Sequence, residues 1–247
     1  MATTEFAVHG TDNGAVRESV VNDFSIQIAT VNGSGSQSAN NILLRTIFQM
    51  GVPVSGKNMF PSNIAGLPTW FTIRASKDGY IARKKEIDLL IAMNAETAQD
   101  DVKTLAPGAS VLYDEPLGLD KLRNDLTFYA VPYDKLVTAV CSEAKLRKLI
   151  KNMIYVGVAA QLLEIDFAEV EKAIRKQFAT KPKAATLNLA AAKAGHESPE
   201  LRVAINKYLD KGPDFVKYGG TSHWNSPVFI GFSLDAQKAT QAPLSQT

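Results

Sequence analysis

Cysteine and histidine are scarce in this 247-residue chain. It has one cysteine, Cys141, and three histidines, His9, His196 and His223. A lone thiol forms no intrachain disulfide and cannot supply the four cysteines that an iron–sulfur cluster usually needs, and the scattered histidines lack the spacing of a zinc site. No histidine has an evident acid partner, so the sequence predicts no metal site and no catalytic residue. Cys141, in the helical-looking segment 138–146, is interpreted as a small buried hydrophobe.

Long apolar runs and a strong net charge are also missing. The longest apolar run, residues 153–163, is too short to cross a bilayer, and the first residues lack the basic and apolar segments of a signal peptide. With 27 basic and 25 acidic residues the net charge is only +2, which gives no chain-wide field for nucleic acid or acidic membranes. We therefore expect a cytoplasmic protein with no nucleic-acid partner and no membrane span.

Three regions follow from the pattern along the chain. Residues 1–22 are polar and aperiodic and predict a flexible N-terminal arm, residues 23–210 predict the folded domain, and residues 211–247 have the composition of a linker-like tail. Apolar and polar patterning predicts strands at 24–31, 52–56, 69–75, 87–93, 110–114 and 126–132, with helices at 38–50 and 96–105. Strands that alternate with helices indicate a mostly parallel, helix-flanked sheet.

Beyond Pro132 the patterning is helical. Apolar residues recur at three- and four-residue steps over 145–163, Asp166 is a candidate N-cap for 167–179, and Gly195 is a candidate C-cap for 183–195. We expect this helical portion to complete the α/β domain.

The segment Gly33-Ser34-Gly35-Ser36-Gln37-Ser38 stands between a predicted strand and a predicted helix. It is a near match to the dinucleotide fingerprint GxGxxG, with serine in place of the third glycine. A strand that turns on glycines into a helix presents unpaired backbone N–H groups, which favour an anionic ligand. A tight glycine turn without a ligand is the alternative.

Acidic residues are absent from Ser25 to Lys77, whereas Arg45, Lys57, Arg74 and Lys77 occur there. An NAD site normally places an Asp or Glu about 20 residues after the glycines to bind the ribose hydroxyls. The acid-free window therefore favours NADP or coenzyme A, since both carry a ribose phosphate that a lysine or arginine can pair with.

The loop that follows, residues 57–70, is expected near the carboxyl edge of the sheet, where ligands of open α/β sheets bind. Asn58, Ser62 and Asn63 are candidates for polar contacts there, and Phe60 and Trp70 are interpreted as core residues. Asp114 and Glu115, after the strand 110–114, are either a carboxylate pair or a strand-ending turn.

Five segments in order resemble a known family: residues 33–51, 57–74, 86–97, 146–174 and 178–195. They are similar to the gamma subunit or gamma domain of the 2-oxoacid:acceptor oxidoreductases, the thiamine-dependent pyruvate and 2-oxoglutarate:ferredoxin oxidoreductases. The likeness is closest to the gamma domain fused at the N-terminus of the alpha subunit in 2-oxoglutarate-type enzymes, so the chain is either a separate gamma subunit or a fragment.

The resemblance implies a Rossmann-like three-layer α/β/α domain with a helical C-terminal portion that contributes to coenzyme A binding. It places thiamine diphosphate, Mg and the iron–sulfur clusters in partner subunits, namely alpha, beta and in some assemblies a ferredoxin-like subunit, with ferredoxin or another protein as electron acceptor. The implied cofactor-binding residues are Gly33, Ser34, Gly35, Ser36, Gln37 and Ser38, with Lys57 as a phosphate cation and Asn58 as its hydrogen-bonding neighbour.

The chain departs from the family pattern at two places. Ser36 and Ser38 stand where glycine is common, so hydroxyl contacts are expected to replace part of the close backbone approach to phosphate. The second loop has Ala65 where the family has an arginine, which removes a charged contact. Two alternatives remain open from the residues alone: a free-standing NADP-binding reductase domain and a non-catalytic scaffold subunit.

Overall fold

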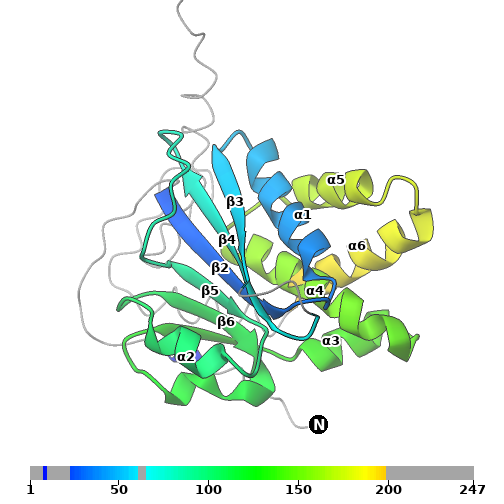
Figure 1. The fold of residues 1–247 in the computed structure, drawn as a ribbon. Coiled ribbons are helices and arrows are strands. Elements are labelled where there is room, and N and C mark those ends of the chain that lie inside the picture. The colour runs from blue at the N-terminus through cyan, green and yellow to red at the C-terminus, as the bar shows by residue number, and fades with distance from the viewer. Residues whose placement is uncertain (1–7, 10–22, 61–64, 199–247) are drawn as a thin grey trace, which may run out of the picture.

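The computed structural model describes residues 8–9, 23–60 and 65–198, in which a seven-stranded sheet lies between helices (Figure 1). One face carries five helices and the other carries α2 (Ala98–Lys103). The five are α1 (Ser36–Gln49), α3 (Tyr133–Val140), α4 (Ala144–Leu162), α5 (Phe167–Gln177) and α6 (Pro182–His196). The predicted Rossmann-like α/β/α fold is confirmed. Apart from residues 8–9, the predicted arm 1–22 and the predicted tail 211–247 lie outside the described residues.

The strand order is β1-β7-β6-β5-β2-β4-β3. The four strands β7, β6, β5 and β2 are parallel neighbours, whereas β4 is antiparallel to both β2 and β3, and β1 is antiparallel to β7. Their bounds are β1 (Val8–His9), β2 (Asp23–Val31), β3 (Val54–Met59), β4 (Pro68–Ser76), β5 (Leu89–Ala92), β6 (Ser110–Asp114) and β7 (Thr127–Val131). From β2 the chain goes outward to β3 and β4 and then returns to β5 on the other side of β2. The carboxyl ends of β2 and β5 are therefore the topological switch point, where open α/β sheets bind ligands.

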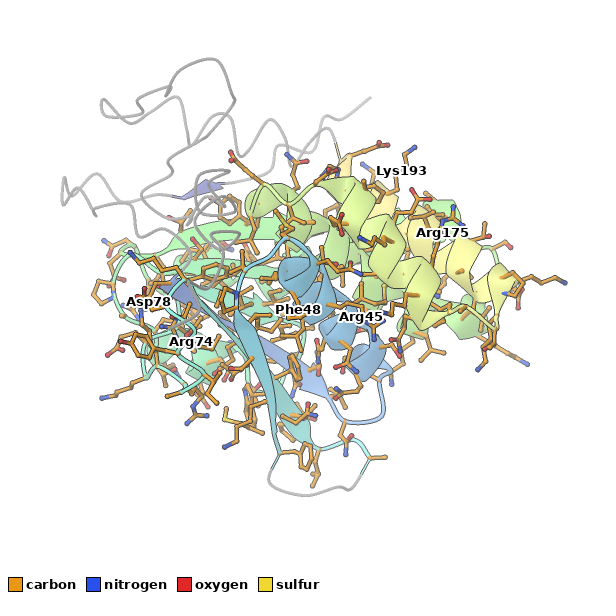
Figure 2. All side chains as sticks on the ribbon, turned by 90° about the horizontal axis from the view of Figure 1, so that it is seen from above. Arg45, Phe48, Arg74, Asp78, Arg175 and Lys193 are labelled. Carbon is orange, nitrogen blue, oxygen red and sulfur yellow. The ribbon has the colours of Figure 1, made fainter. Side chains whose placement is uncertain are left out.

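Alternation along the strands sorts the side chains between the two faces of the sheet. In β4, Phe71, Ile73 and Ala75 belong to the core beneath the five helices, while Trp70 packs against the smaller core beneath α2. The buried Arg74 leaves β4 on the same face as Trp70, and Figure 2 labels it apart from Arg45 of α1. Within the described residues, none of the helices is both long enough and apolar enough to cross a membrane.

Two glycines let α4 and α6 approach each other closely. A Cβ atom added to Gly157 would lie 1.8 Å from the Ala192 carbonyl oxygen, and one added to Gly195 would lie 2.3 Å from the Ile154 carbonyl oxygen. The interpretation of Gly195 as a helix C-cap is therefore wrong. It lies inside α6, which ends at His196, and its missing side chain makes room for the backbone of α4.

Among the other predictions from the sequence, one is confirmed and two need correction. Asp166 is the N-cap of α5, since its Oδ1 accepts a hydrogen bond from Ala168 N at 2.9 Å. Cys141 is buried as predicted, but it lies between α3 and α4 rather than inside one helix. The strand expected at 52–56 runs from Val54 to Met59, and Phe60 is 45% exposed rather than part of the core.

The close packing of α4 on α6 predicts a large loss of stability for Gly157→Ala. The added methyl group meets backbone, which cannot move aside as a flexible side chain can, so we expect unfolding free energy to fall by about 3 kcal/mol. Chemical denaturation measures this change. Ala190→Ser, which adds one atom on the exposed side of α6, is the matched control and should leave the midpoint unchanged. Equal midpoints for both variants would contradict the packing argument.

Candidate phosphate-binding site at the carboxyl edge of the sheet

A glycine turn joins β2 to α1. Gly33 and Gly35 have φ values of 80° and 82°, in the left-handed region that glycine adopts without strain. Ser34 N donates to the Val31 carbonyl at 3.1 Å, which closes the turn. The strand-to-helix context that the sequence predicts for this loop is therefore present, although α1 begins at Ser36 rather than at Ser38.

The N-terminus of α1 is open. Gly35 is its N-cap residue, no side chain caps the first turn, and no acidic residue lies in that turn. The unpaired N–H groups and the helix dipole together favour an anion here. The Ser34 hydroxyl adds a second feature: the residue is only 9% exposed, and its Oγ has no hydrogen-bond partner. Gln37 is exposed and Ser38 is half-buried, so this turn remains accessible to solvent.

The Ser36 hydroxyl faces the interior. Its Oγ lies 3.0 Å from Thr30 Oγ1, and the pair is buried. Nearby, the Tyr155 hydroxyl donates to Asn40 Oδ1 at 2.7 Å, and burial raises the pKa of Tyr155, so the phenol stays protonated as a donor. Of the three loop serines, Ser36 has its hydroxyl paired with Thr30, whereas the hydroxyl groups of Ser34 and Ser38 form no such buried pair.

Helix α4 fixes the loop from the other side. Asn152 Nδ2 donates to the Ser34 carbonyl at 2.9 Å. A Cβ atom on Gly35 would lie 2.5 Å from Leu149 Cδ2, so Leu149 packs directly on the glycine backbone while remaining 48% exposed. Any side chain at position 35 would have to displace Leu149, and it would also be strained at this φ.

Lys57 and Asn58 lie apart from the loop. Both are exposed residues of β3, the edge strand two positions from β2. Lys57 pairs in register with Thr72 and Asn58 with Phe71, so their side chains leave the strand on opposite faces. Gly33 to Ser38 thus form one turn at the start of α1, and Lys57 and Asn58 lie outside that turn.

Two other cations of the acid-free window have partners elsewhere. Arg45 NH1 donates to Gln177 Oε1 at 3.2 Å, which joins α1 to α5. Arg74 is buried and forms an ion pair with Asp23. The sequence around the loop therefore lacks acids, but neither of these two arginines is placed to bind a ligand at the loop.

Asn94 is a site candidate that the sequence reasoning missed. It lies two residues after the end of β5, beside the end of β2, where Met93 N donates to the Ala29 carbonyl at 2.9 Å. Asn94 is 2% exposed, and its Oδ1 accepts from Glu96 N at 3.1 Å, while its Nδ2 has no partner. Ser34 Oγ and Asn94 Nδ2 are thus unpartnered polar atoms on the two strand ends that flank the switch point. The available signal was an asparagine directly after the apolar strand predicted at 87–93.

The carboxyl ends of β6 and β7 hold an ion cluster. Lys151 Nζ lies 2.6 Å from Asp114 Oδ2 and 2.9 Å from Asp134 Oδ1. Burial opposes the charge on Lys151, but the hydrogen bonds to the two carboxylates outweigh it and raise the pKa of Lys151. Asp114 therefore anchors α4 to the sheet, and Glu115 begins a short 3-10 helix (Glu115–Leu117), so the two acids do not act as a pair. In the described part of the chain, no group of three or more His, Cys, Asp or Glu side chains is arranged to hold a metal ion.

These features define a class: a Rossmann-like domain with an uncapped helix N-terminus at its switch point. The family of pyruvate ferredoxin/flavodoxin oxidoreductases matches residues 25–198, so the chain belongs to that family. A curated relative, subunit alpha of 2-oxoacid:ferredoxin oxidoreductase 2 from Aeropyrum pernix, is 27% identical over 92 residues, which are 37% of this chain and 14% of the relative.

Solved structures share the fold. A 2-oxoglutarate:ferredoxin oxidoreductase from Magnetococcus marinus, solved with 2-oxoglutarate, coenzyme A and succinyl-CoA bound, aligns with a TM-score of 0.63 at 22% identity over 72% of this chain. A keto/oxoacid ferredoxin oxidoreductase gamma subunit from Geobacter sulfurreducens aligns with a TM-score of 0.57 at 20% identity and covers 73% of this chain. A pyruvate oxidoreductase subunit from Thermotoga maritima gives 0.59 at 17% identity and covers 71%.

The share of each relative that this chain covers differs widely. This chain spans 32% of the Magnetococcus chain and 14% of the Aeropyrum subunit. It spans 99% of the Geobacter gamma subunit and 96% of the Thermotoga subunit. The described fold thus corresponds to a free-standing subunit in some relatives and to one part of a longer chain in others.

Proposed function

We propose that this chain is the gamma part of a thiamine diphosphate-dependent 2-oxoacid:acceptor oxidoreductase of the 2-oxoglutarate or pyruvate type, and that it helps bind coenzyme A during oxidative decarboxylation to an acyl-CoA. The observation that carries the proposal is the uncapped N-terminus of α1 at the switch point, flanked by the unpartnered Ser34 Oγ and Asn94 Nδ2. Membership of the family and a neighbour of the same fold that was solved with coenzyme A bound support it.

In this proposal the diphosphate of coenzyme A lies against the first turn of α1. The backbone N–H groups from Gly35 to Ser38 donate to it, and the positive end of the helix dipole stabilises its charge. Ser34 and Ser38 supply hydroxyl donors. Lys57 and Asn58 remain outer contacts of the ligand in the proposal, because the carboxyl end of β3 reaches the same edge of the sheet.

The proposal divides the chemistry between subunits. This chain supplies binding and no catalytic residue. Thiamine diphosphate, Mg and the iron–sulfur clusters belong to alpha, beta and ferredoxin-like partners, and ferredoxin or another protein accepts the electrons. The proposal keeps the cytoplasmic location predicted from the sequence.

A carboxylate in the first turn of α1 should oppose the ligand. Ser38→Glu places a negative charge where the diphosphate would lie, and we expect the dissociation constant for coenzyme A to rise roughly tenfold or more. The same negative charge interacts favourably with the positive end of the helix dipole, so the thermal midpoint should stay equal or rise slightly. Calorimetric titration of the full chain and its thermal midpoint measure the two effects.

Ala190→Glu introduces the same charge on the exposed side of α6 and is the control. Its affinity for coenzyme A should match that of the unmodified chain. Tight binding of NADPH in place of coenzyme A would favour the reductase alternative, and binding of neither would favour the scaffold. If Ser38→Glu bound coenzyme A with unchanged affinity, the proposal that this loop binds coenzyme A would be contradicted.

Asn94→Ser tests the second strand end. A serine hydroxyl can still accept from Glu96 N, so the turn and most of the stability should be kept, but it cannot reach as far as Nδ2. We expect a loss of about fivefold in affinity for coenzyme A, the size of one neutral hydrogen bond. Asn124→Ser, at an exposed position, is the matched control. A variant with unchanged affinity would assign Asn94 a purely structural role.

A further inference from the structure

A basic cavity lies on the face of the sheet opposite α1. It measures about 340 Å³ and is lined by Gln27 of β2, Met59 of β3 and, from the segment before β5, Arg83, Lys84, Lys85 and Ile87. On this face Trp70 links β4 to α2, because its Nε1 donates to Asp101 Oδ1 at 2.9 Å. The segment 77–88, which supplies four of these lining residues, contains no helix or strand.

Three contacts hold this segment over the sheet. Lys84 Nζ lies 2.7 Å from Asp23 Oδ2, Ser55 Oγ donates to the Ile81 carbonyl at 3.0 Å, and Arg83 contacts the Met59 sulfur. Burial opposes the charge of Asp23, but hydrogen bonds from Lys84 and Arg74 outweigh it and hold the pKa of Asp23 below its ordinary value. The segment is therefore attached at the amino end of β2 and at both ends of β3.

The cavity has more positive than negative charge. Asp23 is shared by Arg74 and Lys84, so one carboxylate faces two cations. Among the described residues, no carboxylate forms an ion pair with Arg83 or Lys85. Glu86 is exposed and is not part of the lining, and Asp88 Oδ2 accepts from Ser25 N at 2.8 Å.

Polar groups of the sheet lie beneath this charge. Thr72 is the register partner of Gln27, so both side chains lie on the same face, next to each other. Thr72 is 2% exposed, and its Oγ1 has no hydrogen-bond partner. Met59 and Ile87 add apolar walls to the cationic ones. Cations, the Gln27 amide and apolar walls in one concave site fit a ligand with both a phosphate and a flat apolar part.

We propose that this cavity binds a nucleoside phosphate, with Arg83 and Lys85 paired to the phosphate groups and Met59 and Ile87 against the nucleoside. The site is separate from the N-terminus of α1, because the two lie on opposite faces of the sheet. A volume of about 340 Å³ suits a small ligand rather than a protein segment, whose interface would need a much wider surface.

Titration of the full chain with ADP tests the proposal. The variant with Arg83→Glu and Lys85→Glu should lose roughly tenfold or more in affinity for ADP, and adenosine, which has no phosphate, should bind the unmodified chain much more weakly. A control with Lys176→Glu and Lys183→Glu, exposed residues of α5 and α6, makes the same change in net charge and should bind ADP normally.

Ser38→Glu separates this site from the proposed coenzyme A site. If the cavity is the ADP site, Ser38→Glu retains ADP binding while it loses coenzyme A. Loss of ADP binding in Ser38→Glu, with normal binding in the Arg83 and Lys85 variant, would overturn the inference and leave the proposed function intact. Binding of an acidic peptide but not of ADP would overturn it too, in favour of a protein interface.

Discussion

The hydrogen bond from the Asn152 side chain to the Ser34 carbonyl is the contact on which the shape of the loop depends. It joins residues 118 positions apart and fixes the turn between β2 and α1 against α4. α4 is itself held by the approach of Gly157 to α6 and by Lys151, which bonds Asp114 at the end of β6. The glycine turn is therefore supported by α4 and, through α4, by α6 and β6, so its N–H groups can be arranged before a ligand arrives.

This support explains why the loop differs from a simple glycine turn. The carbonyl side of the turn and the first residues of α1 are bound from inside the protein, by Asn152 and by Tyr155 through Asn40. The outward side keeps the unpaired N–H groups and the accessible Gln37 and Ser38, while Ser34 Oγ is buried and has no hydrogen-bond partner. The two faces of the sheet are also unequal: five helices cover one, and the other carries α2 and the segment 77–88. A single domain thus offers two surfaces with distinct chemistry.

The sequence was sufficient for the strand–turn–helix unit, because glycines, serines and apolar periodicity are local signals. It was insufficient where the deciding partner is distant. Gly195 has the context of a helix end, and only the backbone of α4 shows that it is a packing contact. The inward turn of the Ser36 hydroxyl depends on Thr30, and the significance of Asn94 depends on β5 lying beside β2, which spacing does not reveal. Lys57 and Asn58 are adjacent in sequence, but the pleat of β3 sends them to opposite faces.

Amide hydrogen exchange of the full chain with and without coenzyme A tests the central claim most directly, since the claim concerns backbone N–H groups. The account predicts slower exchange for the amides from Gly33 to Ser38 when coenzyme A is present, with smaller changes at the end of β5. Binding of coenzyme A with no protection in this loop, or with protection confined to other parts of the chain, would contradict it.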